Sequence, residues 1–295
     1  MLILLILIVI NWLFMLNKIL KPLALILLTL VPLLSISGKE VDKKLSDSTA
    51  FITEKSFSNF GYWEHIDFTR LKTSDRIESQ KNLYRYVLDH LELYDDDKVL
   101  EVGSGRGQAA QIIHDEYIAD KYVGLDISKN KTEDAKKLNN KLLESEKTYK
   151  YIVGKAEKLP FDNNSFSRIF SVESPKNFYP FKKFISESER VLKQNGKIVI
   201  ASIFAQNGDS INSLKDLKSS ITSIDNVRKS LKAKGFVDVH IEPIGQYVFD
   251  GFDKWAKSSN EYKNHPMQIW KKAYDEGLIN YYVISGYKPV ELIRI

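Results

Sequence analysis

Lys98-Val-Leu-Glu-Val-Gly-Ser-Gly-Arg-Gly-Gln108 is the stretch of the sequence on which the prediction of the fold depends. Its apolar first half predicts a short buried strand of a parallel sheet. Gly103, Gly105 and Gly107 stand at alternate positions, as expected where a chain turns sharply and lets a ligand approach its backbone. Residues Gln108–Tyr117 then predict a helix whose free N–H groups point at the same spot.

Glu101 ends this strand immediately before the glycines. A carboxylate at that position repels a pyrophosphate but suits an ammonium or a hydroxyl group. A dinucleotide fingerprint would also place a small residue at position 108, where this chain has Gln, so a nicotinamide-dependent oxidoreductase is disfavoured. The pattern E-x-G-x-G-x-G instead resembles the first motif of class I S-adenosylmethionine-dependent methyltransferases.

The composition excludes several kinds of site. The chain of 295 residues contains no cysteine, which excludes disulfides, thiolate metal sites and a cysteine nucleophile. Its five histidines show no metal-ligand spacing, so we expect no metal. The net charge of +5 comes from lysines spread along the chain without a basic, aromatic stripe, so we expect no nucleic-acid partner.

Residues 1–37 form a hydrophobic segment that predicts a membrane anchor. A single span needs about 20 apolar residues, and the runs 1–16 and 23–34 are each shorter, so one tilted span, a re-entrant hairpin and a cleaved signal peptide remain open. Residues 38–56 predict a polar linker whose lysines favour a catalytic domain that faces the cytoplasm. Residues 57–295 would then form that domain.

An aromatic element, Asn59-Phe-Gly-Tyr-Trp-Glu64, opens the predicted domain. It resembles the "HFGYW" element of tocopherol, sterol and rebeccamycin methyltransferases, and the resemblance implies that Tyr62 and Trp63 help to close the cofactor pocket. Ordinary packing of these rings is the alternative. The resemblance also implies a cofactor contact for Gln80, for which a solvated helix face is the alternative. His65, beside the aromatic element, is a candidate base.

Asp126 ends the second predicted strand, where doubly wound folds place a carboxylate on the ribose hydroxyls. Its alternative role is to cap the helix expected over residues 129–146. Further along the chain, Lys155-Ala-Glu-Lys-Leu-Pro-Phe161 resembles the family segment "G-D-A-E-x-L-P-F", which flanks the adenine. Lys155 replaces the usual Asp, whereas Ala156 and Glu157 match.

Val172-Glu-Ser-Pro-Lys-Asn-Phe178 resembles the family element "E-S-x-x-H-F", whose His lies near the transferred methyl group. Asn177 holds the His position here, and an amide cannot act as a general base. Glu173 is the nearest carboxylate, with either a catalytic or a structural role. Residues 245–277 form an insertion rich in aromatic residues, which predicts either a lid over an apolar acceptor or a helical pair packed at the edge of the domain.

Together these patterns predict an α/β, Rossmann-like, doubly wound sheet, and the resemblance implies seven strands with strand seven antiparallel beside strand five. The implied enzyme binds S-adenosyl-L-methionine and methylates a lipophilic small molecule, such as an isoprenoid, a quinone or a lipid-like acceptor, at a membrane. A catalytically silent cofactor-binding membrane module is the alternative. The cofactor-binding residues implied by the resemblance are Tyr62, Trp63, Gln80, Glu101, Gly103, Ser104, Gly105, Gly107, Asp126, Ile127, Ala156, Glu157 and Ser171.

Overall fold

The computed structural model describes most of the predicted catalytic domain. The described residues are 57–119, 121–144, 148–214, 221–258 and 268–290. The predicted anchor over residues 1–37 and the predicted linker over residues 38–56 lie outside them. Within the described ranges, we find no helix whose length and apolar character would let it cross a bilayer.

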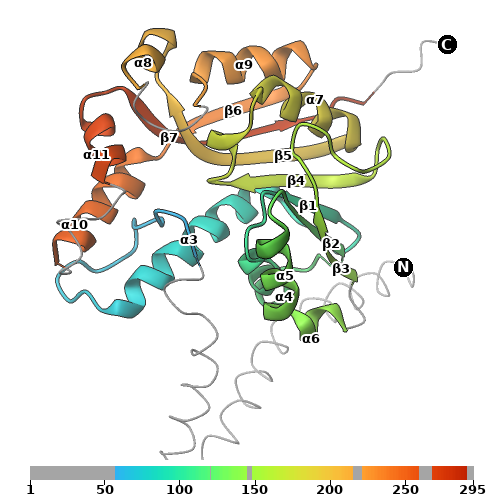
Figure 1. Ribbon diagram of the computed structural model, residues 1–295, viewed down its shortest axis with the longest axis horizontal. Helices are drawn as coiled ribbons and strands as arrows, with labels where there is room; N and C mark the ends of the chain where they lie inside the picture. The colour runs from blue at the N-terminus through green and yellow to red at the C-terminus, as the bar shows by residue number, and fades with distance from the viewer. Residues whose placement is uncertain (1–56, 120, 145–147, 215–220, 259–267, 291–295) are drawn as a thin grey trace, which may run out of the picture. The chain divides into compact units, whose positions relative to one another are not determined.

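A seven-stranded mixed sheet forms the centre of the domain, in the order β3-β2-β1-β4-β5-β7-β6 (Figure 1). β1 to β5 pair in parallel, and β7 lies antiparallel to both β5 and β6. The expected doubly wound sheet with strand seven antiparallel beside strand five is therefore confirmed. The strands are β1 (Lys98–Val102), β2 (Lys121–Asp126), β3 (Thr148–Val153), β4 (Phe166–Val172), β5 (Leu192–Ala205), β6 (Val237–Pro243) and β7 (Ile279–Tyr287).

Helices cover both faces of the sheet, with α3, α4 and α5 on one face and α7 and α9 on the other (Figure 1). Because successive side chains of a strand point to opposite faces, Leu100 and Val102 join the core beneath α7 and α9, whereas Glu101 points to the opposite face. The helices are α3 (Thr73–Leu91), α4 (Gln108–Glu116), α5 (Lys129–Leu138), α6 (Asn140–Leu143), α7 (Phe181–Val191), α8 (Gly208–Ser213), α9 (Ile224–Ala233), α10 (Gly251–Ser258) and α11 (Gln268–Asp275), with the short turns η1 (Pro175–Asn177) and η2 (Gln246–Asp250).

The strand order reverses between β1 and β4, since the chain runs outward from β1 to β3 and then returns to the other side of β1. In open α/β sheets, ligands bind at the carboxyl ends of the strands beside such a reversal. The glycine-rich loop after β1 and the turn η1 after β4 both lie at this point. The topology therefore places the two most informative sequence motifs beside each other.

The helix expected over residues 129–146 is in fact two helices. α5 ends at Leu138, and the short α6 begins at Asn140. The buried Asn139 side chain donates hydrogen bonds of 3.0 Å to the carbonyl oxygens of Gly107 and Ala135. Through these two hydrogen bonds, the Asn139 side chain at the break connects the helix pair to the glycine-rich loop.

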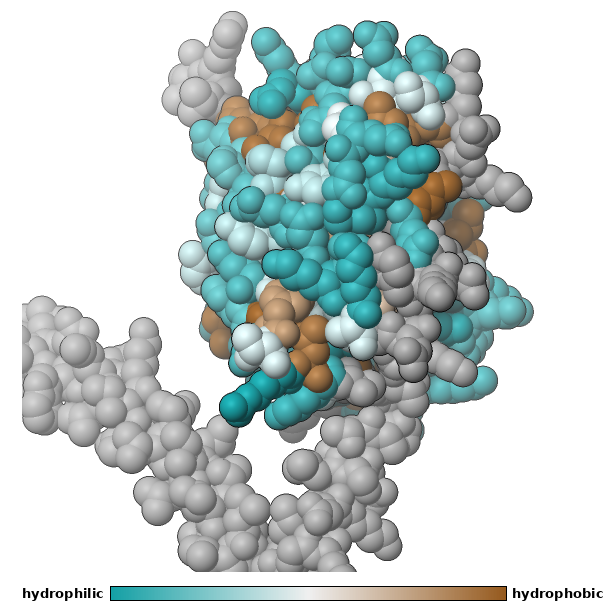
Figure 2. Space-filling view, turned by 90° about the vertical axis from the view of Figure 1, so that its left-hand side faces the viewer, coloured by the Kyte–Doolittle hydropathy of each residue, from teal (hydrophilic) through white to brown (hydrophobic). Residues whose placement is uncertain are grey.

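The insertion over residues 245–277 contributes η2, α10 and α11. Its aromatic side chains Phe249, Phe252 and Trp255 are buried. Figure 2 views the molecule from the side on which α10 and α11 lie in Figure 1, and it shows a mainly hydrophilic surface with small, separate hydrophobic patches. Phe249, Phe252 and Trp255 therefore face the domain, whereas Ile269 of α11 is 48% exposed.

Candidate functional site

The glycine-rich loop binds back onto the neighbouring strand. The backbone N–H groups of Gly103 and Ser104 donate to the carbonyl oxygen of Leu125 at 2.6 and 3.0 Å. Gly105 has a φ of +55°, and a Cβ atom added there would meet no other atom within 4 Å. Gly105 thus combines a left-handed backbone with open space beside it, which is the geometry required where a ligand lies against the main chain.

Asp126 lies directly beside this loop, at the carboxyl end of β2. Its Oδ2 atom accepts a hydrogen bond of 2.9 Å from the Gly105 N–H, and its Oδ1 atom accepts one of 2.8 Å from the Ser128 N–H. Ser128 itself caps α5 through its hydroxyl, which accepts from the Lys131 N–H. A carboxylate has about four acceptor positions, so Asp126 retains two for the hydroxyl groups of a ligand.

Glu101 is fully buried on the face of the sheet that α3 covers. Its Oε2 atom accepts a hydrogen bond from the Tyr122 hydroxyl, and Tyr84 of α3 lies close enough to interact with the same carboxylate. Burial raises the pKa of Glu101 to about 8, and the hydrogen bond from Tyr122 opposes that shift. A ligand ammonium beside Glu101 would favour its ionised form.

Two buried oxygen atoms in this region make no hydrogen bond of normal geometry with the described residues: Glu101 Oε1 and Gln80 Oε1. Gln80 lies one helical turn before Tyr84, so both side chains share the face of α3 that meets the sheet. The Gln80 amide nitrogen donates to the Asn59 carbonyl oxygen at 3.2 Å. Because both orphaned atoms are acceptors, they suit a donor such as an ammonium group.

Two serines from the predicted set hold the strand ends together. Ser104 and Ser171 are both buried. The Ser171 hydroxyl of β4 donates to the Val102 carbonyl oxygen of β1. The Ser171 hydroxyl is therefore hydrogen-bonded to the protein itself. Ser104 forms part of the glycine-rich loop through its backbone N–H.

An exposed apolar surface adjoins Asp126. Ile127 is 65% exposed and Val153 is 47% exposed, and Val153 pairs with Asp126 in the register of β2 and β3. Large apolar side chains at a strand edge suit the flat face of an aromatic ligand. Ala156, which follows in the loop after β3, is buried.

The loop after β3 is fixed by residues of α7. Arg190 donates to the carbonyl oxygens of Leu159 and Phe161 at 2.9 and 2.7 Å, and Glu187 accepts a hydrogen bond of 2.8 Å from the Leu159 N–H. Glu157, from the same loop, accepts a hydrogen bond of 2.8 Å from the Tyr179 N–H. The predicted adenine-flanking segment is thereby connected to the segment that follows β4.

Glu173 lies at the end of β4 with a left-handed φ of 61°, which is uncommon for a residue other than glycine. Its Oε1 atom accepts a hydrogen bond of 3.0 Å from the Phe60 N–H, and its Oε2 atom accepts one of 2.5 Å from Lys176 Nζ. Burial and the charge of Glu173 raise the pKa of the Tyr281 hydroxyl. Glu173 therefore joins the aromatic element to the carboxyl edge of the sheet.

Asn177 and His65, the other predicted catalytic residues, are both exposed. Asn177 is the last residue of η1, immediately after the Glu173–Lys176 pair. The His65 Nε2 atom lies 3.7 Å from the Oε2 atom of the neighbouring residue Glu64. Asn177 thus follows Glu173 closely in the sequence, and among the described residues His65 contacts neither of the two.

The aromatic element packs against the insertion. The Phe60 ring centroid lies 5.2 Å from that of Phe249 and 5.4 Å from that of Phe252. Trp63 is buried, with its ring 6.1 Å from the Trp255 ring, and Tyr62 stacks on Tyr86 at 4.5 Å. These rings form a continuous aromatic cluster between residues 60–63 and residues 249–255.

Arg76 of α3 fixes this cluster. Its guanidinium donates to the carbonyl oxygens of Phe60 and Asn59 at 2.9 and 2.8 Å, and it lies 5.1 Å from both the Phe252 and the Trp255 ring centroids. Sequence patterns did not identify Arg76, Tyr84, Tyr122 or Lys176. Their roles depend on contacts between elements far apart in the chain, which no local pattern contains.

This set of groups fits S-adenosylmethionine. Asp126 would provide acceptors for the ribose hydroxyls, Ile127 and Val153 would provide an apolar surface for the adenine, and the orphaned oxygens of Glu101 and Gln80 would suit the amino group of the methionine moiety. Gly105 leaves space for the cofactor beside the loop. The described residues contain no cluster of three or more histidine or carboxylate side chains that could hold a metal ion.

Comparisons with known proteins point to the same chemistry. Residues 100–200 match a family model described as a methyltransferase domain. The chain is 27% identical to a phthiotriol/phenolphthiotriol dimycocerosates methyltransferase of Mycobacterium ulcerans, over 52% of this chain and 55% of that protein. It is 32% identical to the demethylmenaquinone methyltransferase of Thermotoga maritima, over 38% of this chain and 45% of that protein. The chain thus spans about half the length of these two relatives.

The fold also matches solved structures. Geranyl diphosphate C-methyltransferase of Streptomyces coelicolor, solved with S-adenosyl-L-homocysteine, superposes with a TM-score of 0.68 at 15% identity, covering 79% of this chain and 91% of that one. At 15% identity this superposition shows a similar fold. The family model and the curated relatives, which are methyltransferases, support the same cofactor. Residues 100–200 thus form a methyltransferase domain, and together the comparisons support an S-adenosylmethionine-dependent methyltransferase.

Proposed function

We propose that the protein transfers a methyl group to a lipophilic small molecule, such as an isoprenoid, a quinone or a lipid-like acceptor. The observation that carries the proposal is the aromatic cluster of residues 60–63 and 249–255, because Phe60 binds Glu173 at the carboxyl edge of the sheet. The rings of this cluster are themselves buried, so an acceptor at that edge would lie beside polar groups that are backed by aromatic side chains, a combination that is usual in small-molecule sites. The names of the curated relatives, which include a quinone and a lipid methyltransferase, support the same class of acceptor.

The polar groups at this edge favour an acceptor atom that needs no deprotonation. Bound S-adenosylmethionine supplies an activated methyl group on a sulfonium. One oxygen of Glu173 accepts from the Phe60 N–H and the other is ion-paired with Lys176, which indicates a structural role for this carboxylate, and Asn177 cannot accept a proton at neutral pH. The protein then contributes mainly alignment of the reactants and exclusion of water, of which alignment alone supplies several kcal/mol. An amine or a carbon nucleophile meets these conditions.

We further propose that residues 1–37 anchor the enzyme to the membrane in which its acceptor resides, with the catalytic domain facing the cytoplasm. The hydrophobic sequence of this segment and the lysines that follow it support the proposal. Washing membranes from cells that express the full chain with alkaline carbonate tests it. The protein should stay in the membrane pellet, and release into the supernatant would contradict anchorage.

The activity is tested by incubating the full chain with methyl-labelled S-adenosylmethionine and a lipid extract of membranes. Label should enter the organic phase, and mass spectrometry of the labelled compound would identify the acceptor. A Gly105→Val variant, which places a side chain in the open space beside the loop, serves as the control. Label confined to the aqueous phase, together with normal cofactor binding, would contradict a lipophilic acceptor.

A catalytically silent cofactor-binding module is the second candidate, because two positions depart from the family pattern. Lys155 replaces the usual Asp of the adenine segment, Asn177 replaces the His, and both residues are exposed. This candidate predicts that the protein binds the cofactor but does not convert it to S-adenosylhomocysteine, whichever membrane extract is supplied. Formation of S-adenosylhomocysteine above the rate of the Gly105→Val control would exclude it.

A further inference from the structure

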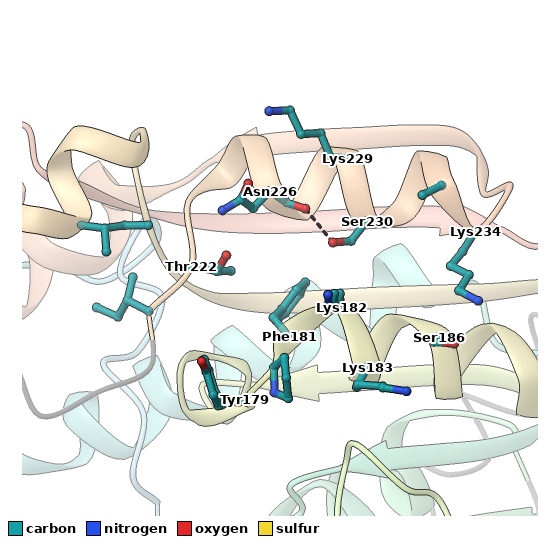
Figure 3. Close-up of a pocket in the computed structure, with 14 residues that line it drawn as sticks. Tyr179, Phe181, Lys182, Lys183, Ser186, Thr222, Asn226, Lys229, Ser230 and Lys234 are labelled. Carbon is teal, nitrogen blue, oxygen red and sulfur yellow. Dashed lines mark hydrogen bonds between the residues drawn. The ribbon is translucent and has the colours of Figure 1, made fainter.

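A groove with a volume of about 880 Å³ runs between α7 and α9 (Figure 3). Pockets of a few hundred to a thousand Å³ hold one small ligand or headgroup. Tyr179, Pro180 and Phe181 line one end, and Lys234 lies at the other. The groove is separate from the glycine-rich loop and from Asp126, neither of which lines it.

Lysines determine the charge of this groove. Lys182 and Lys183 line it from α7, Lys229 and Lys234 line it from the region of α9, and the lining contains no Asp or Glu. In Figure 3, Lys182 rises between the two helices and Lys234 descends toward α7, whereas Lys229 points away.

None of these lysines has a carboxylate oxygen within ion-pair distance among the described residues, although Glu187 of α7 interacts electrostatically with Lys183. By contrast, Lys176, Lys197 and Lys271 each lie within 3.3 Å of a carboxylate oxygen. Because lysines but no Asp or Glu line the groove, its net charge is positive and is complementary to an anion from outside the chain.

The rest of the lining is mixed: the polar side chains Ser186, Thr222, Asn226 and Ser230 alternate with apolar ones, and an exposed aromatic ring lies at one end. The apolar residues Ile211, Ile221 and Ala233 also line the groove. Tyr179 is 74% exposed at its end. Lysines beside apolar side chains with a tyrosine at the margin are typical of surfaces that meet the headgroup region of a bilayer.

We propose that the α7–α9 groove binds the anionic headgroup of a membrane phospholipid. The lysines contact the phosphate, the apolar lining contacts the upper part of the acyl chains, and Tyr179 lies in the interface. An amphiphile satisfies both the charge and the apolar lining, whereas a nucleic acid or an acidic peptide would satisfy the charge alone. None of the predicted site residues lines this groove, so the proposal does not depend on the identity of the acceptor.

Hydrogen–deuterium exchange of the full chain in lipid nanodiscs tests this proposal, because exchange reports on each segment separately. Discs of phosphatidylcholine alone are compared with discs in which the fraction of phosphatidylglycerol is increased stepwise. Exchange over residues 181–186 and 224–233 should slow as the anionic fraction rises. An unchanged exchange pattern across the series would overturn the proposal.

The charge requirement is tested with the K182Q/K183Q/K234Q variant. One lysine near an anionic surface contributes roughly a fivefold change in binding, so three together contribute roughly a hundredfold change, and the protection should disappear. The matched control K121Q/K141Q/K150Q removes three exposed lysines elsewhere and should behave like the wild type. Equal loss in both variants would show a general charge effect and would overturn the site. Protection by inorganic phosphate in neutral discs would assign the groove to a free anion and would overturn the lipid headgroup.

Discussion

Replacing Glu101 by Gln should change how the stability of the protein depends on pH. Glu101 is fully buried, and burial raises its pKa from the ordinary value of 4.5 to about 8. Between these two values the folded chain binds more protons at this position than the unfolded chain does. The stability that the protonated group contributes is therefore fully present below about pH 4.5 and is lost as the pH rises to about 8.

The size of the effect follows from the width of this interval. One pKa unit corresponds to about 1.4 kcal/mol, so the shift from 4.5 to about 8 corresponds to at most about 5 kcal/mol. Glutamine carries no titrating proton, and its amide oxygen still accepts the hydrogen bond that Tyr122 gives to Glu101 in the wild type. The variant should therefore be nearly as stable as the wild type at acidic pH and more stable at pH 8.

The assay is denaturant unfolding of the full chain in a neutral detergent, without cofactor, at several pH values from 5 to 8. The difference in the free energy of unfolding between variant and wild type isolates Glu101 from the other titrating groups. A Glu144→Gln variant, which changes an exposed glutamate, serves as the matched control. Wild-type and Glu101→Gln profiles that stay parallel within about 1 kcal/mol across this range would refute the reasoning.

Three further substitutions test other parts of the site. Gly105→Val places a side chain in the open space beside the loop and should weaken S-adenosylmethionine binding at least about tenfold, whereas Gly208→Val, also beside open space, should leave the calorimetric affinity unchanged. Asp126→Asn removes the charge that faces the ribose hydroxyls and should weaken the same affinity by about 1–3 kcal/mol; an unaltered dissociation constant would contradict the ribose role. Gly251→Ala brings a Cβ atom to 2.2 Å from the Trp63 Cβ atom, so thermal unfolding should show a loss of about 1–3 kcal/mol, and unchanged stability would mean that the aromatic cluster tolerates this displacement.

The order of the elements could be predicted from the sequence because each strand and helix has a local signal. The apolar run at residues 99–102 and the glycines after it predict β1 and its loop, and the structure has β1 at Lys98–Val102. The position of Asp126 could be predicted as well, because a parallel register brings the ends of β1 and β2 together. The break at Asn139 could not, since Asn139 acts through a contact with Gly107, 32 residues away in the chain.

The residues that bind the two buried carboxylates also could not be predicted from the sequence. Glu101 and Glu173 have clear places in the motifs, but Tyr122, Phe60 and Lys176, which bind them, carry no distinguishing local pattern. The sequence also does not indicate whether an aromatic residue is buried. The packing of Trp63 against Trp255 could therefore be identified only from the structure. The predicted roles of Tyr62 and Gln80 toward the cofactor and of His65 as a base remain predictions.

Calorimetric titration of the full chain with S-adenosylmethionine, S-adenosylhomocysteine and NAD⁺ tests the central claim, that the glycine-rich loop and Asp126 form the cofactor site. We predict that the first two ligands bind with one molecule per chain, that NAD⁺ does not bind, and that Gly105→Val weakens the binding at least about tenfold. Equal binding of S-adenosylmethionine by wild type and Gly105→Val would place the cofactor elsewhere, and binding of NAD⁺ in its stead would contradict the account.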